Sequence, residues 1–485
     1  MRSEFSTGVA YLHSFQYSQA TKAFSDIAAR DPKCAMAYWG QAMSLYQQIW
    51  NFPNAAILTK GHDYIEKAQD LRAKTKRERE YIAALATFYQ LNPKLSQIER
   101  TEDYSKAIAE VYADNPSDAN AGAWYALSLV ALAQDGVNDL DDRKHAISIL
   151  QKLFAEHPDN PGVDHYLIHA ADTPQLAPEA LAAARNYAKI APDSAHALHM
   201  PSHIFTRLGY WQDSIDSNLA SAAAAEKATR SGSDDESGYQ VHAMTYLEYA
   251  YLQRGEDQKA REVIAQLRDV QGDDALDLEE EQALFRITYD METHDWKAAS
   301  QIAMPPKDAY PSDMQSLYWA RTIAVVRMGD AATARQNLVR LQRVFASVPE
   351  ARWKQKYLTP ADLTEAESWT DFAEGNSSLA KKMMRQAVAT EGSRDSDDLT
   401  FPATEMLADL LLASHEPALG AYENALKANP NRFDSLYGAA MAALAEGKRA
   451  KAYSYAEQLE KSCAADEDRP EIRVSRTLLS ERAPR

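Results

Sequence analysis

The sequence predicts an all-helical fold, an α-solenoid built from repeated pairs of antiparallel helices. Glycine is scarce, at 17 of 485 residues, while alanine and leucine, which favour helices, are abundant. The chain is longer than a single hydrophobic core usually reaches, roughly 250–300 residues. Finally, Pro158 and Pro192 lie 34 residues apart, and each follows a stretch with small or apolar residues at helical spacing.

Each predicted unit has two helices, with small residues where they touch and in many units a proline after the second helix. In chain order, the residues that mark the units are Gly8, Tyr11, Ala20, Phe24 and Pro32; Ala146, Leu150 and Leu153; Ala180, Ala184 and Tyr187; Gly209, Trp211 and Asn218; Gly255, Ala260, Ile264 and Leu267; Gly329, Ala334, Leu338 and Leu341; Gly375, Ala380, Met384 and Ala387; Ala418, Tyr422, Ala425 and Pro430; and Gly447, Ala452, Ala456 and Leu459. With this period, the chain resembles tetratricopeptide repeat proteins over nearly its whole length, with about ten to twelve units.

A second resemblance is carried by two longer stretches. "DPKCAMAYWGQAMSLYQQIWNFP" at 31–53 and "HALHMPSHIF" at 196–205 are similar to a bacterial tetratricopeptide subfamily with HxxxH and HxxHMPSH motifs. The resemblance implies the repeat fold and no particular activity.

One segment interrupts the helical pattern near the middle of the chain. "ATRSGSDDESG" at 228–238 is rich in Ser, Gly and Asp, which favours a flexible loop. We therefore expect an N-terminal array over 1–227, a flexible loop over 228–238 and a C-terminal array over 239–485 that continues the solenoid. A longer surface loop with no hinge function is the alternative.

Composition excludes several classes of function. A net charge of −18 opposes binding to nucleic acid, because phosphates are repelled. The sequence has no apolar run of about 18 residues, so we expect no membrane span. Cys34 and Cys463 are the two cysteines, so a disulfide framework and a CxxC metal site are excluded. The first residues show no export signal, and "MRSEF" resembles a cloning-derived segment, so the compartment, cytoplasmic or exported after loss of a leader, stays open.

Histidine is concentrated in one region. Five of the twelve histidines lie between His165 and His203. Four of them form two HxxxH pairs, His165 with His169 and His199 with His203, separated by 34 residues, or one repeat. The i,i+4 spacing places both imidazoles of a pair on one face of a helix.

The repeat resemblance implies that both pairs point into the same groove, because the first helix of each tetratricopeptide unit lines the concave surface. Neighbouring helices lie about 8–10 Å apart, so four imidazoles can converge between them. Imidazole suits Zn, Cu or Fe, whereas Ca and Mg prefer oxygen ligands. We therefore predict a transition-metal site with the ligands His165, His169, His199 and His203. Residues predicted as orienting groups or substitute ligands are His196, His242, Asp164 and Glu248, with Asp172 as a further nearby carboxylate.

Pro201 lies inside the second histidine pair and leaves two local structures open. A proline within a helix removes a backbone hydrogen bond and kinks the helix. Alternatively, the helix starts late, with Pro201 in its first turn, and His199 leaves the helical face.

Aromatic residues predict a ligand groove along the concave wall. Trp39, Tyr46 and Trp50 share one helical face, and Trp124 and Tyr249 occupy later first helices. These side chains would bind a small molecule or peptide in the concave groove. The alternative is that they form core between repeats.

Three functions follow from the sequence. The first is a superhelix with a histidine-lined transition-metal site, acting as a metal-dependent hydrolase or oxidase on a small molecule or peptide. The second is a non-catalytic scaffold that binds a peptide or protein partner in its groove. The third is a metal-free enzyme that uses a histidine as general base. The sequence contains no GxGxxG, P-loop, GxSxG or HExxH motif.

Overall fold

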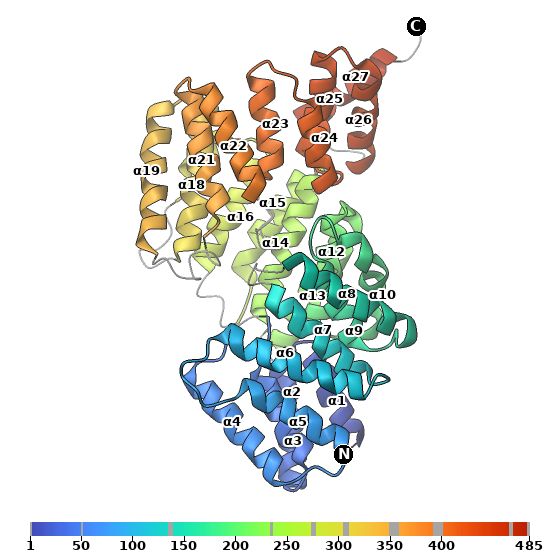
Figure 1. Ribbon diagram of the computed structural model, residues 1–485. Helices are drawn as coiled ribbons and strands as arrows, with labels where there is room; N and C mark the ends of the chain where they lie inside the picture. The colour runs from blue at the N-terminus through green and yellow to red at the C-terminus, as the bar shows by residue number, and fades with distance from the viewer. Residues whose placement is uncertain are drawn as a thin grey trace. The chain divides into compact units, whose positions relative to one another are not determined.

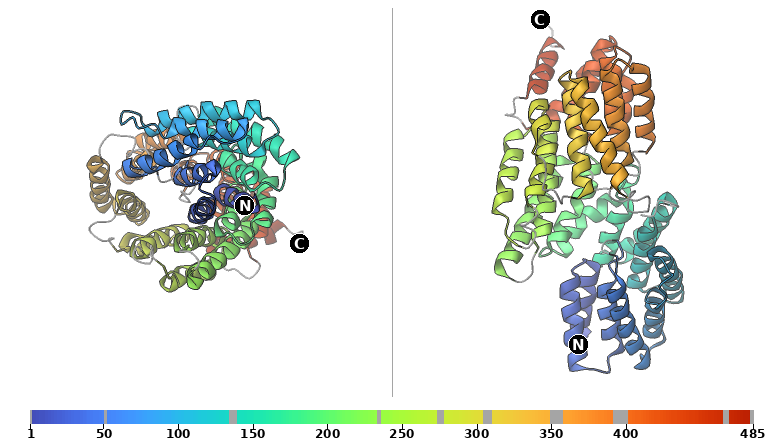
Figure 2. Two further views of the ribbon diagram at one scale, coloured as in Figure 1. Left: turned by 90° about the horizontal axis from the view of Figure 1, so that it is seen from below. Right: turned by 90° about the vertical axis from the view of Figure 1, so that its left-hand side faces the viewer.

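The structure is a computed structural model of the chain. It describes residues 2–49, 52–133, 139–232, 236–272, 278–303, 310–348, 358–390, 401–464 and 469–482. Within these ranges every regular element is a helix and none is a strand, so the prediction of an all-helical repeat array is confirmed. Antiparallel helices follow one another along the chain in each part of the molecule (Figures 1 and 2).

Contacts divide the chain into two compact units, residues 1–204 and 205–485, with the division inside one helix. The helices of the first unit are α1 (Arg2–His13), α2 (Tyr17–Arg30), α3 (Ala35–Leu45), α4 (Ala55–Asp70), α5 (Lys76–Phe88), α6 (Gln97–Asp114), α7 (Ala119–Ala133), α8 (Asp139–Glu156), α9 (Pro161–Ala171), the 3-10 helix η1 (Ala177–Ala180), α10 (Leu181–Ile190), α11 (Ala195–His199) and α12 (Pro201–Arg207), which crosses the division.

The helices of the second unit are α13 (Trp211–Ser231), α14 (Ser237–Gln253), α15 (Asp257–Gln266), the 3-10 helix η2 (Leu267–Asp269), α16 (Leu278–Glu292), α17 (Trp296–Gln301), α18 (Pro311–Arg327), α19 (Ala331–Ser347), α21 (Pro360–Ala373), α22 (Ser377–Thr390), α23 (Ala403–Ala413), α24 (Leu419–Ala428), α25 (Phe433–Ala445), α26 (Arg449–Ser462) and α27 (Pro470–Arg482).

The predicted flexible loop over 228–238 is mostly helix ends. Helix α13 continues to Ser231, and α14 begins at Ser237. Residues 233–235 lie outside the described residues, and the predicted boundary between the two arrays stays a prediction.

Small residues bring the helices together where the repeat pattern placed them. Phe24 of α2 is fully buried between Gly8 of α1 and Gly40 of α3. A Cβ atom at Gly8 would lie 2.9 Å from the Phe24 ring, and one at Gly40 would lie 2.4 Å from it. Any larger residue at either position would therefore push the helices apart.

The turn between the two helices of a unit needs a left-handed residue. Glycine takes this place, with φ between 66° and 90°, at Gly209, Gly255, Gly329, Gly375 and Gly447. In the first repeat, formed by α1 and α2, Phe15 occupies this turn position, five residues before the buried Ala20. Its φ is 56°. A bulky residue in this conformation costs roughly 1–2 kcal/mol, so Phe15 is held there by its surroundings.

The first unit also brings distant segments together. Besides packing against the next helix in the chain, each of several helices packs against the corresponding helix of the following repeat. These pairs are α1 with α3, α3 with α5 and α7 with α9. In addition α1 contacts α9, so the turn after α1 lies against the helix that carries His165 and His169.

A buried ionic network holds together four helices of the second unit. Arg432, at the N-cap of α25, is 0% exposed. Its guanidinium donates to both carboxylate oxygens of Glu405 at 3.0–3.1 Å and to Tyr249 Oη at 2.8 Å, and Nη2 lies 2.8 Å from Glu292 Oε1. These opposite charges raise the pKa of Arg432 even though burial opposes them. Ion pairs and hydrogen bonds of Arg432 therefore connect α14, α16, α23 and α25 in the interior of this unit.

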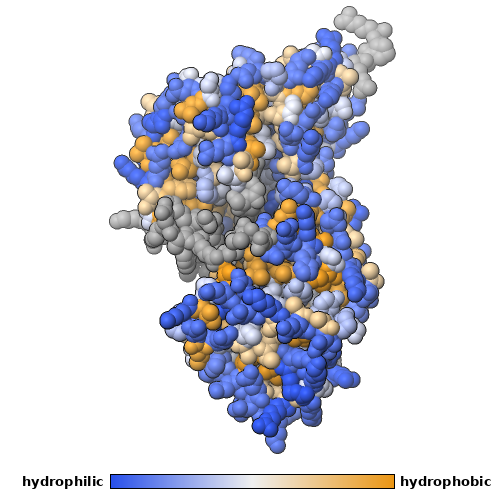
Figure 3. Space-filling model, in the orientation of Figure 1, coloured by the Kyte–Doolittle hydropathy of each residue, from blue (hydrophilic) through white to orange (hydrophobic). Residues whose placement is uncertain are grey.

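The outer surface is largely hydrophilic, with scattered apolar residues over both units in the face shown in Figure 3. Among the described residues, no helix is both long enough and apolar enough to cross a membrane.

Candidate metal centre

Helix α9 positions the first pair of predicted ligands. It starts at Pro161, where Asn160 caps the helix by accepting a hydrogen bond from the Gly162 N–H at 3.0 Å. His165 and His169 follow one turn apart on the same face. At the other end, Arg143 donates to the backbone carbonyl of His169 at 2.9 Å, which holds the last turn in place.

Helices α11 and α12 position the second set. Ser194 caps α11 by accepting from the Ala197 N–H, and the short helix carries His196 and His199. Met200 keeps a right-handed helical conformation, and α12 begins directly at Pro201. The chain is therefore helical on both sides of Pro201. His199 is the last residue of α11 and Pro201 is the first residue of α12, so the helix breaks at the proline while His199 remains helical.

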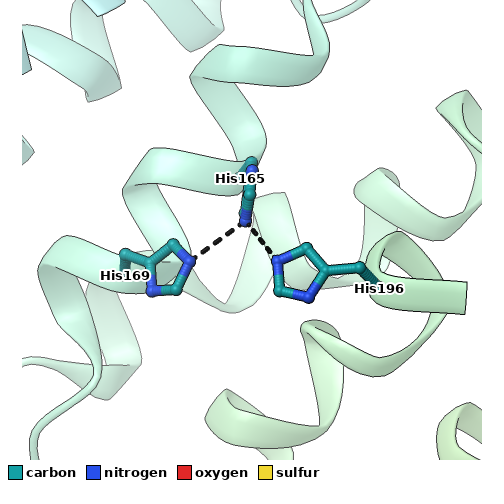
Figure 4. A group of neighbouring side chains, drawn as sticks. All are labelled: His165, His169 and His196. Carbon is teal, nitrogen blue, oxygen red and sulfur yellow. Dashed lines mark hydrogen bonds between the residues drawn. The ribbon is translucent and has the colours of Figure 1, made fainter. Parts of the chain in front are cut away.

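Three histidines converge in the first unit, and we call His165, His169 and His196 the three-histidine cluster (Figure 4). The Nε2 atom of His165 lies 2.9 Å from Nε2 of His196 and 3.0 Å from Nε2 of His169. One ring nitrogen from each of the three residues lies within 4.8 Å of the others. His165 is 0% exposed and His196 4%, while His169 is partly buried.

Hydrogen bonding fixes the tautomer of the central ring. The Nδ1–H of His165 donates to the backbone carbonyl of His13 at 2.6 Å, which leaves a lone pair on Nε2. That lone pair accepts one hydrogen bond, yet two neighbouring Nε2 atoms lie at contact distance. The three nitrogens lie close enough together that they could hold one metal ion.

Burial keeps these rings neutral. It lowers the pKa of His165 to about 3, against the raising effect of the His13 carbonyl. Burial, followed by the neighbouring rings, lowers the pKa of His169 and His196 well below the usual value. Neutral imidazole is the form that binds metal, so the cluster presents metal-ready nitrogens at neutral pH.

The other two predicted ligands form a separate pair. The Nε2 atoms of His199 and His203 lie 2.9 Å apart, and the two residues are 1% and 6% exposed. The Nδ1–H of His203 donates to Asp172 Oδ2 at 2.8 Å. The four predicted ligands thus lie in two pairs, and His196, expected as a substitute ligand, joins the first pair with its Nε2 atom 2.9 Å from that of His165.

Phe15 covers the three-histidine cluster, and sequence reasoning missed it. Its ring is 3% exposed and lies 4.4 Å from the His165 ring centroid, 5.6 Å from His169 and 5.7 Å from His196. The sequence feature that could have indicated Phe15 is a phenylalanine at the turn position where several other repeats have glycine. A strained residue over a cluster of ligand-type side chains is typical of functional sites.

His13 was also missed, and it holds the turn that carries Phe15. Its Nε2–H donates to Asn120 Oδ1 at 2.9 Å, and Tyr166 Oη donates to its Nδ1 at 3.0 Å. The ring stacks on Trp124 with centroids 4.8 Å apart. Gly162 makes room for it, because a Cβ there would lie 2.2 Å from His13 Nδ1.

The carboxylates Asp164 and Glu248, predicted as orienting residues, are not hydrogen-bonded to the three-histidine cluster in the described part of the chain. Asp164 is buried and accepts from Asn186 Nδ2 of α10 at 3.0 Å, and burial raises its pKa to about 7. His242 and Glu248 both belong to α14 in the second unit. The ring of His242 meets Tyr246, and Glu248 is 0% exposed with a pKa raised by burial.

The predicted groove aromatics are packing residues. Trp39, Tyr46, Trp124 and Tyr249 are each 5% exposed or less. Trp39 packs edge-to-face on Trp124, Tyr46 contacts Phe88 and Tyr104, and Tyr249 contacts Trp211. Their apolar rings are more stable between repeats than in water, so the core alternative describes them. Trp50 lies outside the described residues.

Comparison with known proteins adds no family. No protein family model matches the chain, and no curated protein matches it. Among solved structures, a human IFIT1 dimer with PPP-AAAA aligns over 94% of this chain and 90% of that chain, with 14% identity and a TM-score of 0.38. A human IFIT1 dimer with m7Gppp-AAAA aligns over 88% and 90%, with 12% identity and a TM-score of 0.35. Neither alignment exceeds 14% identity or a TM-score of 0.38, so neither supports a conclusion about this chain.

Proposed function

We propose that this chain is a metal-binding helical repeat protein and that His165, His169 and His196 hold one transition-metal ion. The observation that carries the proposal is the convergence of three Nε2 atoms around His165, whose tautomer is fixed by the His13 carbonyl. In tetrahedral coordination with metal–nitrogen bonds of about 2.0–2.1 Å, ligand nitrogens lie about 3.3 Å apart. The observed separations of 2.9 and 3.0 Å need only small side-chain shifts.

The ligand set decides the class of ion. Three imidazole nitrogens suit Zn, Cu or Fe, and oxygen-seeking Mg and Ca are excluded as preferred ions. Three protein ligands leave a fourth position open, as in catalytic zinc sites rather than structural ones. We therefore propose a metal-dependent hydrolase or oxidase that acts on a small molecule or peptide.

The same proposal extends to the origin of the chain. The HxxxH and HxxHMPSH motifs that supply these ligands also carry its resemblance to the bacterial tetratricopeptide subfamily. We assign it to that subfamily on these motifs.

The competing function is a scaffold without metal. Stacked helical repeats present extended surfaces that bind peptides or protein partners, and this fold is the observation in favour of it. In that case the histidines would form only hydrogen bonds within the unit, and the protein would gain no stability from metal ions.

Metal analysis separates the two functions. Protein stripped with a chelator is incubated with Zn(II), Cu(II) or Fe(II) until uptake stops, and the bound metal is counted. We expect a stoichiometric ion in the wild-type protein and its loss in His169→Ala and His196→Ala. His157→Ala, a histidine at the end of α8 outside the cluster, is the control and keeps the metal. A wild-type protein that retains no ion and melts at the same temperature with and without metal contradicts the proposal.

A further inference from the structure

The second histidine pair has the features of a metal position of its own. His199 and His203 are almost fully buried, and their Nε2 atoms lie 2.9 Å apart. Asp172 accepts the Nδ1–H of His203, so the Nε2 atom of His203 carries a lone pair that faces His199. Metal-ligating histidines commonly donate their other N–H to a carboxylate in this way.

Asp172 is placed for this contact by the helix that carries the first set of ligands. It is the C-cap residue of α9, three positions after His169, and is 7% exposed. A carboxylate at a helix C-terminus is unfavourable, because the helix dipole places negative charge there. A nearby cation or a protonated imidazole offsets that cost, and His203 is the imidazole that Asp172 contacts.

Helices α9 and α11 each carry a residue of the three-histidine cluster, and three positions later along the chain lies a residue of the second pair or its orienting carboxylate. On α9, His169 belongs to the three-histidine cluster, and Asp172 contacts the second pair three residues later. On α11, His196 belongs to the cluster, and His199 belongs to the second pair three residues later. Residues three apart on a helix have Cβ atoms about 5–6 Å apart, so the two positions are separated by about one helical turn.

Electrostatics agrees with this proximity. Burial is the largest cause of the lowered pKa of His196, followed by the rings of His165 and His169. His199 and His203 lower it further. Asp172 in turn acts to raise the pKa of His169. Each set therefore lies within electrostatic range of the other.

We propose that His199 and His203, with Asp172 as the orienting carboxylate, bind a second late first-row transition-metal ion, so that the centre is binuclear. This inference rests on the proposed function of the three-histidine cluster. Two neighbouring metal ions can hold both sides of a reacting group, which suits hydrolysis of an ester or amide. The five imidazoles favour Cu(II) or Zn(II) over Mn(II) or Mg(II).

Titration with Cu(II), followed by metal counting and electron paramagnetic resonance, tests the second position in the full chain. We expect two ions per wild-type chain and a weakened resonance signal, because neighbouring Cu(II) ions couple magnetically. His203→Ala should bind one ion and regain the full signal of an isolated Cu(II). Asp172→Asn, which keeps the size of the side chain, should weaken only the second ion, by about 10–100-fold. His157→Ala again serves as the control and should bind two ions.

The outcomes distinguish the two proposals. If the wild-type chain binds only one ion, the binuclear centre is contradicted and a single site remains. This holds whether or not the His203→Ala variant still binds that ion. A chain that binds no ion overturns both proposals. Circular dichroism and melting of the metal-free variants identify any variant that fails to fold. If His203→Ala fails to fold, Asp172→Asn decides the question, because an unchanged second binding constant contradicts the proposal.

Discussion

The Nδ1 atom of His165 lies 2.6 Å from the backbone carbonyl oxygen of His13, a residue 152 positions earlier in the chain. This contact joins the turn after α1 to the helix that carries His165 and His169. It fixes the tautomer of the central histidine and, through the same turn, places Phe15 over the cluster. The predictions below test this connection and the ionic groups of the second unit.

Substitution of Gly162 tests the close approach of His13 to α9. In Gly162→Ala the new Cβ would lie 2.2 Å from His13 Nδ1, so the ring and its turn must shift. We expect the free energy of unfolding to fall by about 1–3 kcal/mol and metal affinity to fall with it. Chemical denaturation and metal titration measure the two effects.

Gly420→Ala is the matched control, since a Cβ at this helical glycine of the second unit would have no neighbouring atom within 4 Å. It should be neutral or stabilising by about 0.5–1 kcal/mol. Equal effects of the two substitutions would show that the His13 contact is not needed.

Replacement of Phe15 separates backbone strain from packing. Phe15→Ala keeps the left-handed backbone and loses the buried ring, which should destabilise by about 3–5 kcal/mol. Phe15→Gly loses the same ring but relieves the backbone, so it should be more stable than the alanine variant by roughly 1–2 kcal/mol. Urea unfolding gives the order of stability.

Both Phe15 variants should also release metal faster to a chelator, because the ring shields the three-histidine cluster from solvent. Stopped-flow chelation measures the rate. An unchanged rate in both variants would mean that Phe15 serves packing alone.

The second unit should lose stability at alkaline pH. Burial lowers the pKa of His294, but the carboxylates of Asp434 and Glu471 outweigh it and raise the pKa to about 10. The unfolded value is near 6.5, so the stabilising charge is fully present below pH 6.5 and is lost as the pH rises toward 10. With solvent screening of this one-third exposed ring, we expect the Tm to fall by about 2–4 °C over that window.

Thermal scans from pH 6.5 to 10 measure this decline, with His294→Asn as the comparison, because asparagine tolerates the left-handed backbone at this position. The variant should have a flatter profile. Parallel profiles of the two proteins would rule out His294 as the source.

Removal of Arg432 should destabilise the second unit strongly. Arg432→Ala leaves Glu405 and Glu292 buried without their cation, and breaking such a buried pair costs about 3–5 kcal/mol. Denaturant unfolding measures the loss. The exposed pair between Arg30 and Glu4 is the control, because solvent screens this pair and Arg30→Ala should lower the free energy of unfolding far less. Similar losses in both variants would contradict a stabilising network.

The sequence was sufficient for the repeat architecture, because each unit is specified locally. Gly8, Ala20 and Phe24 meet within a single unit, and Gly209 and Gly255 mark turns that only a left-handed residue can make. The i,i+4 spacing likewise determined that His165 and His169 share a helix face. Such features depend on neighbours a few residues away, which a periodic pattern records.

Tertiary structure decided which histidines come together. His196 rather than His199 meets His165, although both lie on α11, because the packing of that helix against α9 decides which of its side chains faces His165. His13 and Phe15 reach the cluster because α1 packs on α9, and no local pattern encodes a contact across 152 residues. The sequence by itself determined which helices form and which histidines share a face. Only the packing of distant helices decided which ring nitrogens meet, since that depends on how the successive units turn in space.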